Sequence, residues 1–329
     1  MELSATPYFS VIIPTRNRPA LFREALNSVL AQSFRELEII VINDGSADEL
    51  LADYHTLERN CDARVKWHYL PQLPNGHGQS YAMNSGASLA VGNYLCFLDD
   101  DDTWCDPEHL QRAHTALLTA DSAVDALYCN QKAYNSQGEL NPDKLWIADL
   151  ETRLGSQKQI TEYAYRVTSE FLLSSRGFAH LNCSIIRRAL YLDMGGMDED
   201  IRYECDRDIY LRTLDAARCI LYSPVYSARH NIPDPAKKDN MSTLAGDLEK
   251  RLYQVSVLKK AVLRARRESV RCYATRALSD IYKHLTGIQL GNGRIATASE
   301  HANQALALRY TLKWHGYCLY LALRRRFSF

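Results

Sequence analysis

The first hundred residues predict an α/β fold with a mostly parallel sheet flanked by helices. β-rich runs alternate there with segments whose apolar residues recur at three- and four-residue steps, which is the pattern of βαβ units. The run from Leu37 to Ile42 is almost continuously apolar, as expected of a parallel strand covered on both faces. Beyond Pro235, long stretches rich in Ala, Leu, Arg and Lys predict three or four further helices.

We expect the elements of the first hundred residues in a fixed order. Strands are predicted at 9–13, 37–42, 65–70 and 93–98, with helices at 20–33, after residue 46, and at 79–90. Pro14 is expected to end the first strand. Residues 130–180 are polar and weakly periodic, so they predict loops and short elements that cross the sheet. Residues 181–188 predict a passage from strand to helix, and residues 206–217 predict a helix.

Polar segments follow three of the four predicted strands. They are Thr15 to Arg18, Asp44 to Ser46, and Asp99 to Asp102. Ligands of open α/β sheets bind in the crevice beyond the carboxyl ends of the strands. One crevice is therefore expected to collect all three segments.

The run Asp99-Asp-Asp-Asp102 is the most informative feature of the sequence. Adjacent carboxylates repel, so keeping several ionised on one turn is unfavourable unless a cation neutralises them. Carboxylate oxygens suit Mn²⁺ or Mg²⁺, with a substrate diphosphate completing the ligand shell. A solvated acidic turn is the alternative, and the position of the run directly after a buried strand favours the metal site.

Cysteine usage and the absence of targeting signals predict a cytoplasmic protein. The nine cysteines include no C-x-x-C spacing, and several lie inside apolar runs, which favours a reducing compartment. Residues 1–8 lack the basic segment of a signal peptide. The longest apolar stretch near the C-terminus, Gly316 to Leu323, is shorter than the roughly 18 to 20 residues that span a bilayer.

Charge is distributed unevenly along the chain. Residues 251–329 hold 15 Lys and Arg against Glu268, Asp280 and Glu300, a net charge of +12, whereas residues 1–250 carry −12. The end of the chain combines Trp314 and Tyr317 with the basic residues of 324–326, as interfacial helices do. Binding to an anionic membrane surface on the inner face of the membrane is therefore expected, with a structural buttress or a homodimer contact as alternatives. No nucleic-acid partner is expected.

Four motifs in order resemble those of the family 2 glycosyltransferases, over about residues 8–232. They are Ser10-Val-Ile-Ile-Pro-Thr-Arg-Asn-Arg18, Val41-Ile-Asn-Asp-Gly-Ser46, Gly92-Asn-Tyr-Leu-Cys-Phe-Leu-Asp-Asp-Asp-Asp102, and Gly195-Gly-Met-Asp-Glu199 followed by Asp206-Arg-Asp-Ile-Tyr-Leu-Arg212. The resemblance implies a GT-A fold and inverting transfer from a nucleotide-diphosphate sugar, with a UDP-sugar as the expected donor. The expected acceptor is a hydroxyl of a carbohydrate or lipid-linked saccharide in cell-surface polysaccharide or glycolipid synthesis. The same resemblance implies a domain at 1–235, with a nucleotide half at 1–103 and an acceptor half at 104–235, followed by a basic helical region at 236–329.

The resemblance also implies roles for individual residues. Asp206 is expected to be the general base, and the metal ligands are expected to be Asp101, Asp99 and His230. The expected donor contacts are Pro14, Thr15, Asn17, Asp44, Asn84, Asp99 and Asp100. An ordinary turn aspartate is the alternative for Asp44, and a structural histidine is the alternative for His230.

Two positions depart from the family pattern. Met83 stands where many members have Arg, and Cys205 stands where the Glu of a Glu-Asp pair is usual, with Glu204 one residue earlier. The missing glutamate keeps open a catalytically inactive homologue that binds nucleotide sugars. A glycoside hydrolase is disfavoured, because carboxylates clustered on one turn do not flank a glycosidic bond. A sugar-nucleotide pyrophosphorylase is disfavoured because no Gly-rich phosphate loop follows the first strand.

Overall fold

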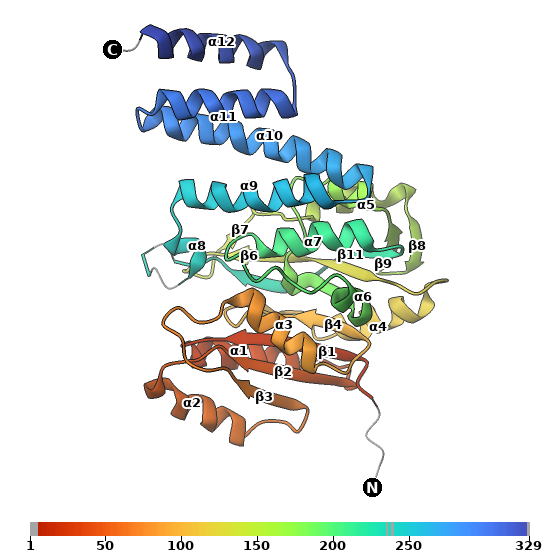
Figure 1. Ribbon diagram of the computed structural model, residues 1–329. Coiled ribbons are helices and arrows are strands. Elements are labelled where there is room, and N and C mark those ends of the chain that lie inside the picture. The colour runs from red at the N-terminus through yellow and green to blue at the C-terminus, as the bar shows by residue number, and fades with distance from the viewer. Residues whose placement is uncertain (1–5, 235, 238–239, 328–329) are drawn as a thin grey trace. The chain divides into compact units, whose positions relative to one another are not determined.

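The computed structural model describes residues 6–234, 236–237 and 240–327, and it divides the chain into two compact units at residues 234 and 235 (Figure 1). The first unit is an α/β domain, and the second is made of helices. Residues 1–5 of the N-terminal segment and residues 328–329 of the basic, aromatic end lie outside the described residues.

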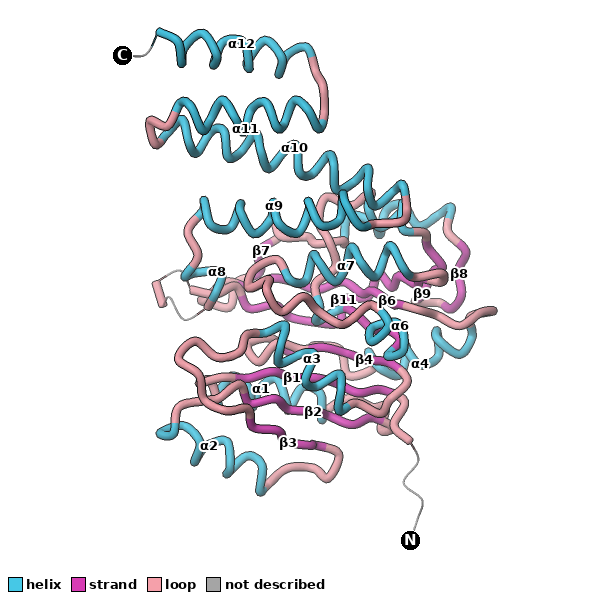
Figure 2. Tube along the Cα trace, viewed as in Figure 1, coloured by secondary structure: helices cyan, strands magenta, loops and turns pink. Residues whose placement is uncertain are grey.

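A single mixed sheet forms the centre of the first unit (Figure 2). Its strand order is β3-β2-β1-β4-β10-β6-β11-β9-β8. In addition, β5 pairs with β11, and β7 pairs with β6. Strands β1 to β4 are parallel, as predicted, whereas β10 runs antiparallel to β4 and β6. The strands are β1 Phe9–Thr15, β2 Leu37–Asn43, β3 Val65–Tyr69, β4 Tyr94–Phe97, β5 Thr103–Trp104, β6 Ala126–Tyr134, β7 Leu140–Asn141, β8 Lys158–Thr161, β9 Ala164–Val167, β10 Ser184–Arg187 and β11 Ile220–Asn231.

Helices connect these strands and cover the sheet. They are α1 Pro19–Leu30, α2 Asp48–Arg59, α3 Gln79–Leu89, α4 His109–Thr119, α5 Ser169–Leu173, α6 Arg188–Asp193 and α7 Cys205–Ala216, with 3-10 turns η1 Ala148–Ser156 and η2 Leu181–Cys183. Helix α3 lies directly on β1 because Gly86 has no side chain: a Cβ there would stand 2.5 Å from Ile12. The apolar periodicity of residues 20–33 is confirmed, since Phe22, Ala25, Leu26 and Val29 of α1 are buried.

The prediction that Pro14 ends the first strand is wrong. Strand β1 continues to Thr15, and Pro14 lies opposite Ile42 of β2. Backbone groups of alternate residues point to opposite neighbours, and Thr15 accepts a hydrogen bond from Asp44 on the β2 side. The backbone nitrogen of Pro14 therefore faces β4, where the pairing with β1 has already ended at Ile12 and Phe97. Proline is tolerated there because no strand hydrogen bond requires its N–H.

The prediction for residues 130–180 is wrong at its start. Strand β6 runs to Tyr134 and lies between β10 and β11, inside the sheet. Asn130 and Gln131 are almost completely buried there. The Asn130 side chain donates to the Pro224 carbonyl oxygen and accepts from the Tyr222 hydroxyl, so a polar residue is satisfied within a buried strand. The rest of the region does consist of short elements.

Helices make up the second unit: α8 Met241–Leu244, α9 Asp247–Arg264, α10 Glu268–Gly291, α11 Ile295–Leu308 and α12 Leu312–Phe327. Helix α10 packs against α9 and α11, and α11 packs against α12. The α11–α12 contact buries Ala302, Cys318 and Leu321, and the Trp314 indole N–H donates to the Ala302 carbonyl oxygen at 2.9 Å. Among the described residues, no helix combines the length and the apolar composition needed to cross a bilayer.

Candidate active site

The loops that follow β1 and β2 are joined by hydrogen bonds at the carboxyl edge of the sheet. Asn17 has a left-handed backbone, with φ of 59°, and its N–H donates to the Ser46 hydroxyl at 2.9 Å. The Asn17 side-chain oxygen accepts the N–H of Ala47 at 2.8 Å. Thr15 bonds the Tyr54 hydroxyl at 2.8 Å. The two loops therefore form one surface, and Asn17 holds them together.

The carboxylate of Asp44 organises the loop before α3. It accepts the backbone N–H groups of His77 and Gly78, each at 2.9 Å, and its Oδ1 lies 2.7 Å from His77 Nδ1. Gly76 and Gly78 both have positive φ, which glycine adopts without strain. The structure thus shows a buried aspartate that shapes a loop near the carboxyl edge of the sheet.

Arg18 contacts the aspartate run and had no role in the sequence-based prediction. Its guanidinium lies 2.5 Å from Asp100 Oδ1 and 2.8 Å from Asp101 Oδ2. The first loop and the aspartates after β4 are therefore joined by two ion pairs. The signal in the sequence was only a basic residue four positions after Pro14, which did not reveal this partner.

Electrostatics in the aspartate run favour a bound cation. Burial, together with the neighbouring carboxylates, raises the pKa of Asp99 well above its ordinary value. Burial also raises the pKa of Asp101, and it raises the pKa of Asp100 to about 7 although Arg18 opposes the change. Several negative charges are costly in a small buried volume, and a bound cation would offset that cost.

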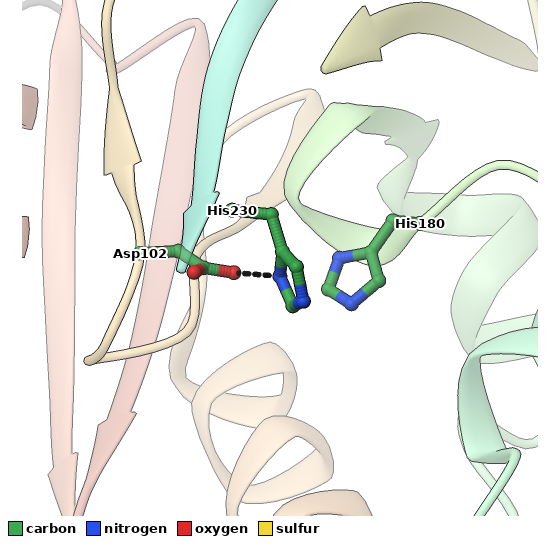
Figure 3. A group of neighbouring side chains, drawn as sticks. All are labelled: Asp102, His180 and His230. Atoms are coloured by element: carbon green, nitrogen blue, oxygen red, sulfur yellow. Dashed lines mark hydrogen bonds and ion pairs between the residues drawn. The ribbon is translucent and has the colours of Figure 1, made fainter. Parts of the chain in front are cut away.

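Asp102 differs from its neighbours, because it is paired with His230 (Figure 3). Its Oδ2 lies 2.8 Å from His230 Nδ1, and its Oδ1 accepts the Asn231 N–H at 2.7 Å. Although burial opposes ionisation, His230 lowers the pKa of Asp102. The contact uses Nδ1 of His230 and leaves Nε2 as the nitrogen for any further ligand.

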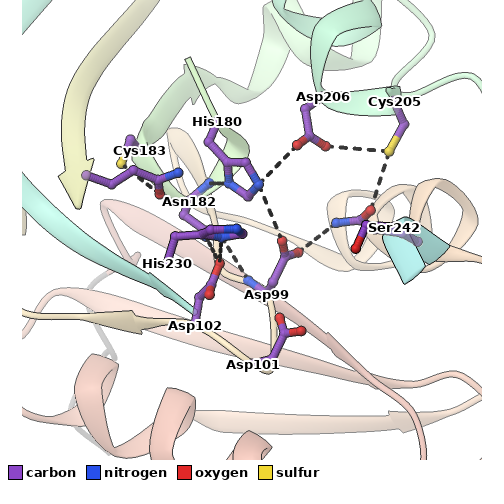
Figure 4. A network of polar contacts seen from close by, with 12 residues as sticks. Asp99, Asp101, Asp102, His180, Asn182, Cys183, Cys205, Asp206, His230 and Ser242 are labelled. Atoms are coloured by element: carbon purple, nitrogen blue, oxygen red, sulfur yellow. Dashed lines mark hydrogen bonds and ion pairs between the residues drawn. The ribbon is translucent and has the colours of Figure 1, made fainter. Parts of the chain in front are cut away.

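His180 lies between the aspartate run and Asp206, and it was given no role from the sequence (Figure 4). Its Nε2 is 3.1 Å from Asp206 Oδ2 and 3.9 Å from Asp99 Oδ2. Its Nδ1 accepts the N–H of Asn182, so the proton of the neutral ring lies on Nε2 and is donated to Asp206. Burial lowers the pKa of His180, which favours this neutral form.

Cys205 packs inside the site and does not replace a glutamate. Its thiol lies 3.4 Å from Gln79 Oε1, and the Gln79 amide donates to Asp99 Oδ1 at 2.6 Å. Glu204 has a left-handed backbone, with φ of 67°, and pairs with Arg207 at 2.9 Å. Glu204 therefore does not compensate for the missing glutamate, because its carboxylate is directed to Arg207.

The side chain of Asn84, a predicted donor contact, is engaged by hydrogen bonds within the protein. Its side-chain oxygen accepts from the Tyr191 hydroxyl and from the Met197 N–H. Its amide nitrogen donates to the Met197 carbonyl oxygen and to Glu199. An asparagine amide offers two donors and two acceptor positions. All four are used within the protein, so Asn84 ties α3 to the loop after α6.

Two groups of side chains among the described residues could hold a metal ion. One consists of Asp99, Asp101 and Asp102, and the other of Asp102, His180 and His230, with ligand atoms in each within 4.8 Å of one another. Both nitrogens of His180 are already engaged, which disfavours the second group as a whole. The first group offers the oxygen ligands that Mn²⁺ and Mg²⁺ prefer, so the residues fit such an ion.

Comparisons with known proteins agree with this architecture. The model of the family described as glycosyl transferase family 2 matches residues 10–192. A GalNAc(5)-diNAcBac-PP-undecaprenol beta-1,3-glucosyltransferase of Campylobacter jejuni is 39% identical over 99 residues, which are 29% of this chain and 30% of that protein. The chain spans between 30% and 59% of the length of the first curated relatives that it matches.

Solved structures share the fold over most of the chain. TarS of S. aureus, in complex with UDP-GlcNAc, has a TM-score of 0.64 at 22% identity. The matched region covers 90% of this chain and 81% of the TarS chain. The mannosyltransferase PcManGT of Pyrobaculum calidifontis, in complex with GDP-Man and Mn2+, has a TM-score of 0.59 at 18% identity, covering 98% of this chain and 87% of its own. The predicted GT-A fold is thereby confirmed.

Proposed function

The chain belongs to glycosyl transferase family 2, and we propose that it transfers a sugar from a UDP-sugar to an acceptor hydroxyl with inversion at the anomeric carbon. One observation carries the proposal. The imidazole of His180 lies 3.1 Å from Asp206 and 3.9 Å from Asp99, so the proposed base and the proposed metal ligands face one site. An acceptor and a donor bound there would meet.

The donor half comprises residues 1–103. Pro14, Thr15, Asn17 and Asp44 contact the nucleoside. The first two end strand β1, and the other two lie in the joined loops that follow β1 and β2. Asp99 and Asp100 follow β4, which pairs with β1, and they complete the donor contacts. Asn84 is left out, since its amide has no remaining hydrogen-bonding capacity.

Asp101, Asp99 and His230 would hold Mn²⁺ or Mg²⁺. His230 takes the place of Asp102 in this set because both Asp102 oxygens are engaged, by His230 Nδ1 and by the Asn231 N–H, whereas His230 Nε2 is left for a ligand. When bound, such an ion stabilises the negative charge that develops on the departing nucleoside diphosphate. The Arg18 guanidinium forms ion pairs with Asp100 and Asp101, and its positive charge compensates part of their negative charge. Asp102 orients the His230 ring through its contact with Nδ1.

Asp206 acts as the general base of a single displacement. The acceptor hydroxyl oxygen forms a bond to the anomeric carbon while the bond from that carbon to the diphosphate oxygen breaks. The hydroxyl proton passes to the Asp206 carboxylate, and the electron pair leaves with the nucleoside diphosphate. Attack opposite the leaving group inverts the configuration. Residues 104–235, which include Asp206, form the acceptor half.

We place the reaction in cell-surface polysaccharide or glycolipid synthesis, with a carbohydrate or lipid-linked acceptor. The name of the Campylobacter relative describes transfer to a saccharide linked to undecaprenol through a diphosphate. Helix α12 would favour a membrane-bound acceptor. Its exposed residues Leu312, Leu319, Tyr320 and Leu323 recur at helical spacing and share one face.

Basic side chains flank this apolar face of α12. With 3.6 residues per turn, Lys313 and Arg324 lie along one edge, and Arg326 lies along the other. The opposite face, with Cys318 and Leu321, packs in the core of the helical unit. An apolar stripe between basic edges suits the surface of an anionic membrane. This pattern supports association of α12 with the membrane.

A catalytically inactive homologue is the second candidate, and Cys205 is the observation that favours it. One experiment separates the two. The purified chain is incubated with a panel of nucleotide sugars and Mn²⁺, and release of nucleoside diphosphate is followed with water or added saccharides as acceptors. Turnover of one donor supports the enzyme. A raised melting temperature with UDP and no turnover of any donor indicates a binding protein.

A further inference from the structure

The backbone of Trp146 is strained at a place close to the candidate active site. Its φ is 46°, in the left-handed region that bulky residues rarely adopt. Such outliers persist where the surrounding structure imposes them, and they cluster at functional sites. The segment between β7 and η1, which contains Trp146, is therefore a candidate for a functional role.

Neighbouring residues hold Trp146 in this conformation. The Ser175 hydroxyl lies 3.0 Å from the Trp146 carbonyl oxygen and 2.5 Å from Asp149 Oδ1. Gly177 packs so closely that a Cβ there would stand 2.4 Å from the same carbonyl oxygen. The position of the indole ring is therefore set by packing on both sides of its backbone.

The strain places the indole beside the two histidines of the site. Its ring centre is 5.1 Å from that of His230 and 6.2 Å from that of His180, with both rings nearly perpendicular to it. His180 in turn contacts Asp206. The indole is only partly buried, and its N–H has no hydrogen-bond partner among the described residues.

The ammonium group of Lys144 lies above the same indole, 5.0 Å from the ring centre. Among the described residues it has no hydrogen bond and no ion pair. Lys144 is exposed as a residue, yet desolvation of the ammonium lowers its pKa, while the charges of Asp102 and Asp206 oppose that change. Among the described residues the Lys144 ammonium has no carboxylate bound to it, and it lies within the electrostatic range of the proposed base.

We propose that Lys144 and Trp146 form an acceptor subsite for a saccharide that carries a phosphate group. The apolar face of the sugar packs on the indole, the indole N–H donates to a hydroxyl, and the Lys144 ammonium pairs with the phosphate. This inference rests on the proposed function and adds the chemical class of the acceptor.

Topology assigns the subsite to the acceptor and not to the donor. The segment follows β7, which pairs with β6. Strand β10 separates β6 from β4, so β6 lies on the side of the sheet away from β1 and β2, whose loops would hold the nucleoside. The phosphate of an acceptor and the diphosphate of the donor share their chemistry, and the test must separate these two sources.

The test measures binding of N-acetylglucosamine 1-phosphate to the full chain by calorimetry, with UDP and Mn²⁺ present at saturation so that the donor site is filled. We expect Lys144→Met to weaken this binding about tenfold or more, because a charge-assisted hydrogen bond is lost. Binding of unphosphorylated N-acetylglucosamine should not change, and Trp146→Phe should weaken both sugars.

Lys132→Met is the matched control, since Lys132 also lies over an aromatic ring, 4.9 Å from the centre of Tyr226. It should leave sugar-phosphate binding unchanged, and equal melting temperatures of Lys144→Met and wild type exclude a folding effect. Unchanged sugar-phosphate binding in Lys144→Met overturns the inference. A parallel loss of UDP affinity also overturns it, because the phosphate would then be the donor's. Failure of the wild-type chain to bind UDP overturns the proposed function instead.

Discussion

The Nε2 atom of His180 lies 3.1 Å from Oδ2 of Asp206, and the Nδ1 atom of the same ring accepts the N–H of Asn182. The imidazole is thereby fixed from both sides, and it holds the Asp206 carboxylate in one orientation. Cys205 contributes a weaker contact, with its thiol 3.5 Å from Asp206 Oδ1. The position before Asp206 carries Cys205 and not the usual glutamate. His180, 26 positions before Asp206, supplies the contact to its carboxylate.

His180→Leu should lower kcat with little change in the donor KM. A misplaced base can cost up to about 100-fold in rate, whereas donor contacts lie on other loops. His180→Gln should retain more activity, because its amide can still donate to Asp206. Steady-state kinetics of both variants check this. Equal losses in the two variants, or a change confined to the Mn²⁺ requirement, would contradict the positioning role.

Asp206→Asn should lower kcat by about 10²- to 10⁴-fold, because the acceptor proton then has no base. UDP affinity, measured by calorimetry, should be unchanged. Asp208→Asn is the informative comparison. Asp208 pairs with Arg212 at 2.8 Å and is buried, so its loss should cost about 1 to 3 kcal/mol of unfolding free energy and leave kcat nearly intact. Full activity in Asp206→Asn would remove this residue as the base.

The stabilisation by Mn²⁺ should grow as pH rises from about 5 to 8. Burial raises the pKa of Asp100 to about 7, and the pKa values of Asp99 and Asp101 are raised in the same direction. The folded protein without metal therefore binds more protons than the unfolded chain, and its stability falls as pH rises through this range. A cation replaces those protons more easily at higher pH.

Thermal unfolding with and without Mn²⁺ measures this effect. Asp101→Asn should abolish most of the shift, while Asp53→Asn, on the exposed side of α2, should preserve it. A Mn²⁺-induced shift that is the same at pH 5 and pH 8 would show that the ion binds elsewhere.

The chain should sediment with phosphatidylglycerol vesicles at low salt and not with phosphatidylcholine vesicles. Charge attraction between the basic edges of α12 and the lipid is screened within about 10 Å at 0.1 M salt, so binding should weaken as salt is added. Replacing Leu319 and Leu323 by Gln should reduce binding about tenfold or more, because both side chains are exposed on the apolar face.

Leu263→Gln provides the control for this experiment, since Leu263 is 82% exposed on α9, outside that face. Binding that survives the double substitution would assign membrane association to another surface. A concentration-dependent dimer that the double substitution dissociates would show that a second copy of the chain covers α12.

Local sequence patterns are enough to predict the parallel arrangement of β1 to β4 and the gathering of polar segments at their carboxyl ends. Local periodicity is enough for this, because a βαβ unit records its strands and helices in consecutive residues. The aspartate run was also visible, since like charges side by side are unfavourable without a counter-charge. Pro14 and β6 were misjudged, because their hydrogen bonds depend on which strands lie beside them.

The partners of the polar side chains, in contrast, depend on how the chain folds in three dimensions. Arg18 and Asp100 are 82 positions apart, and His230 and Asp102 are 128 positions apart. The four hydrogen bonds of Asn84 likewise join it to residues more than 100 positions away in the chain. Hydrogen bonds and ion pairs act over a few ångströms, and the spacing of residues in the sequence does not reveal them. The roles of His180 and Trp146 therefore follow from the folded structure and not from the sequence.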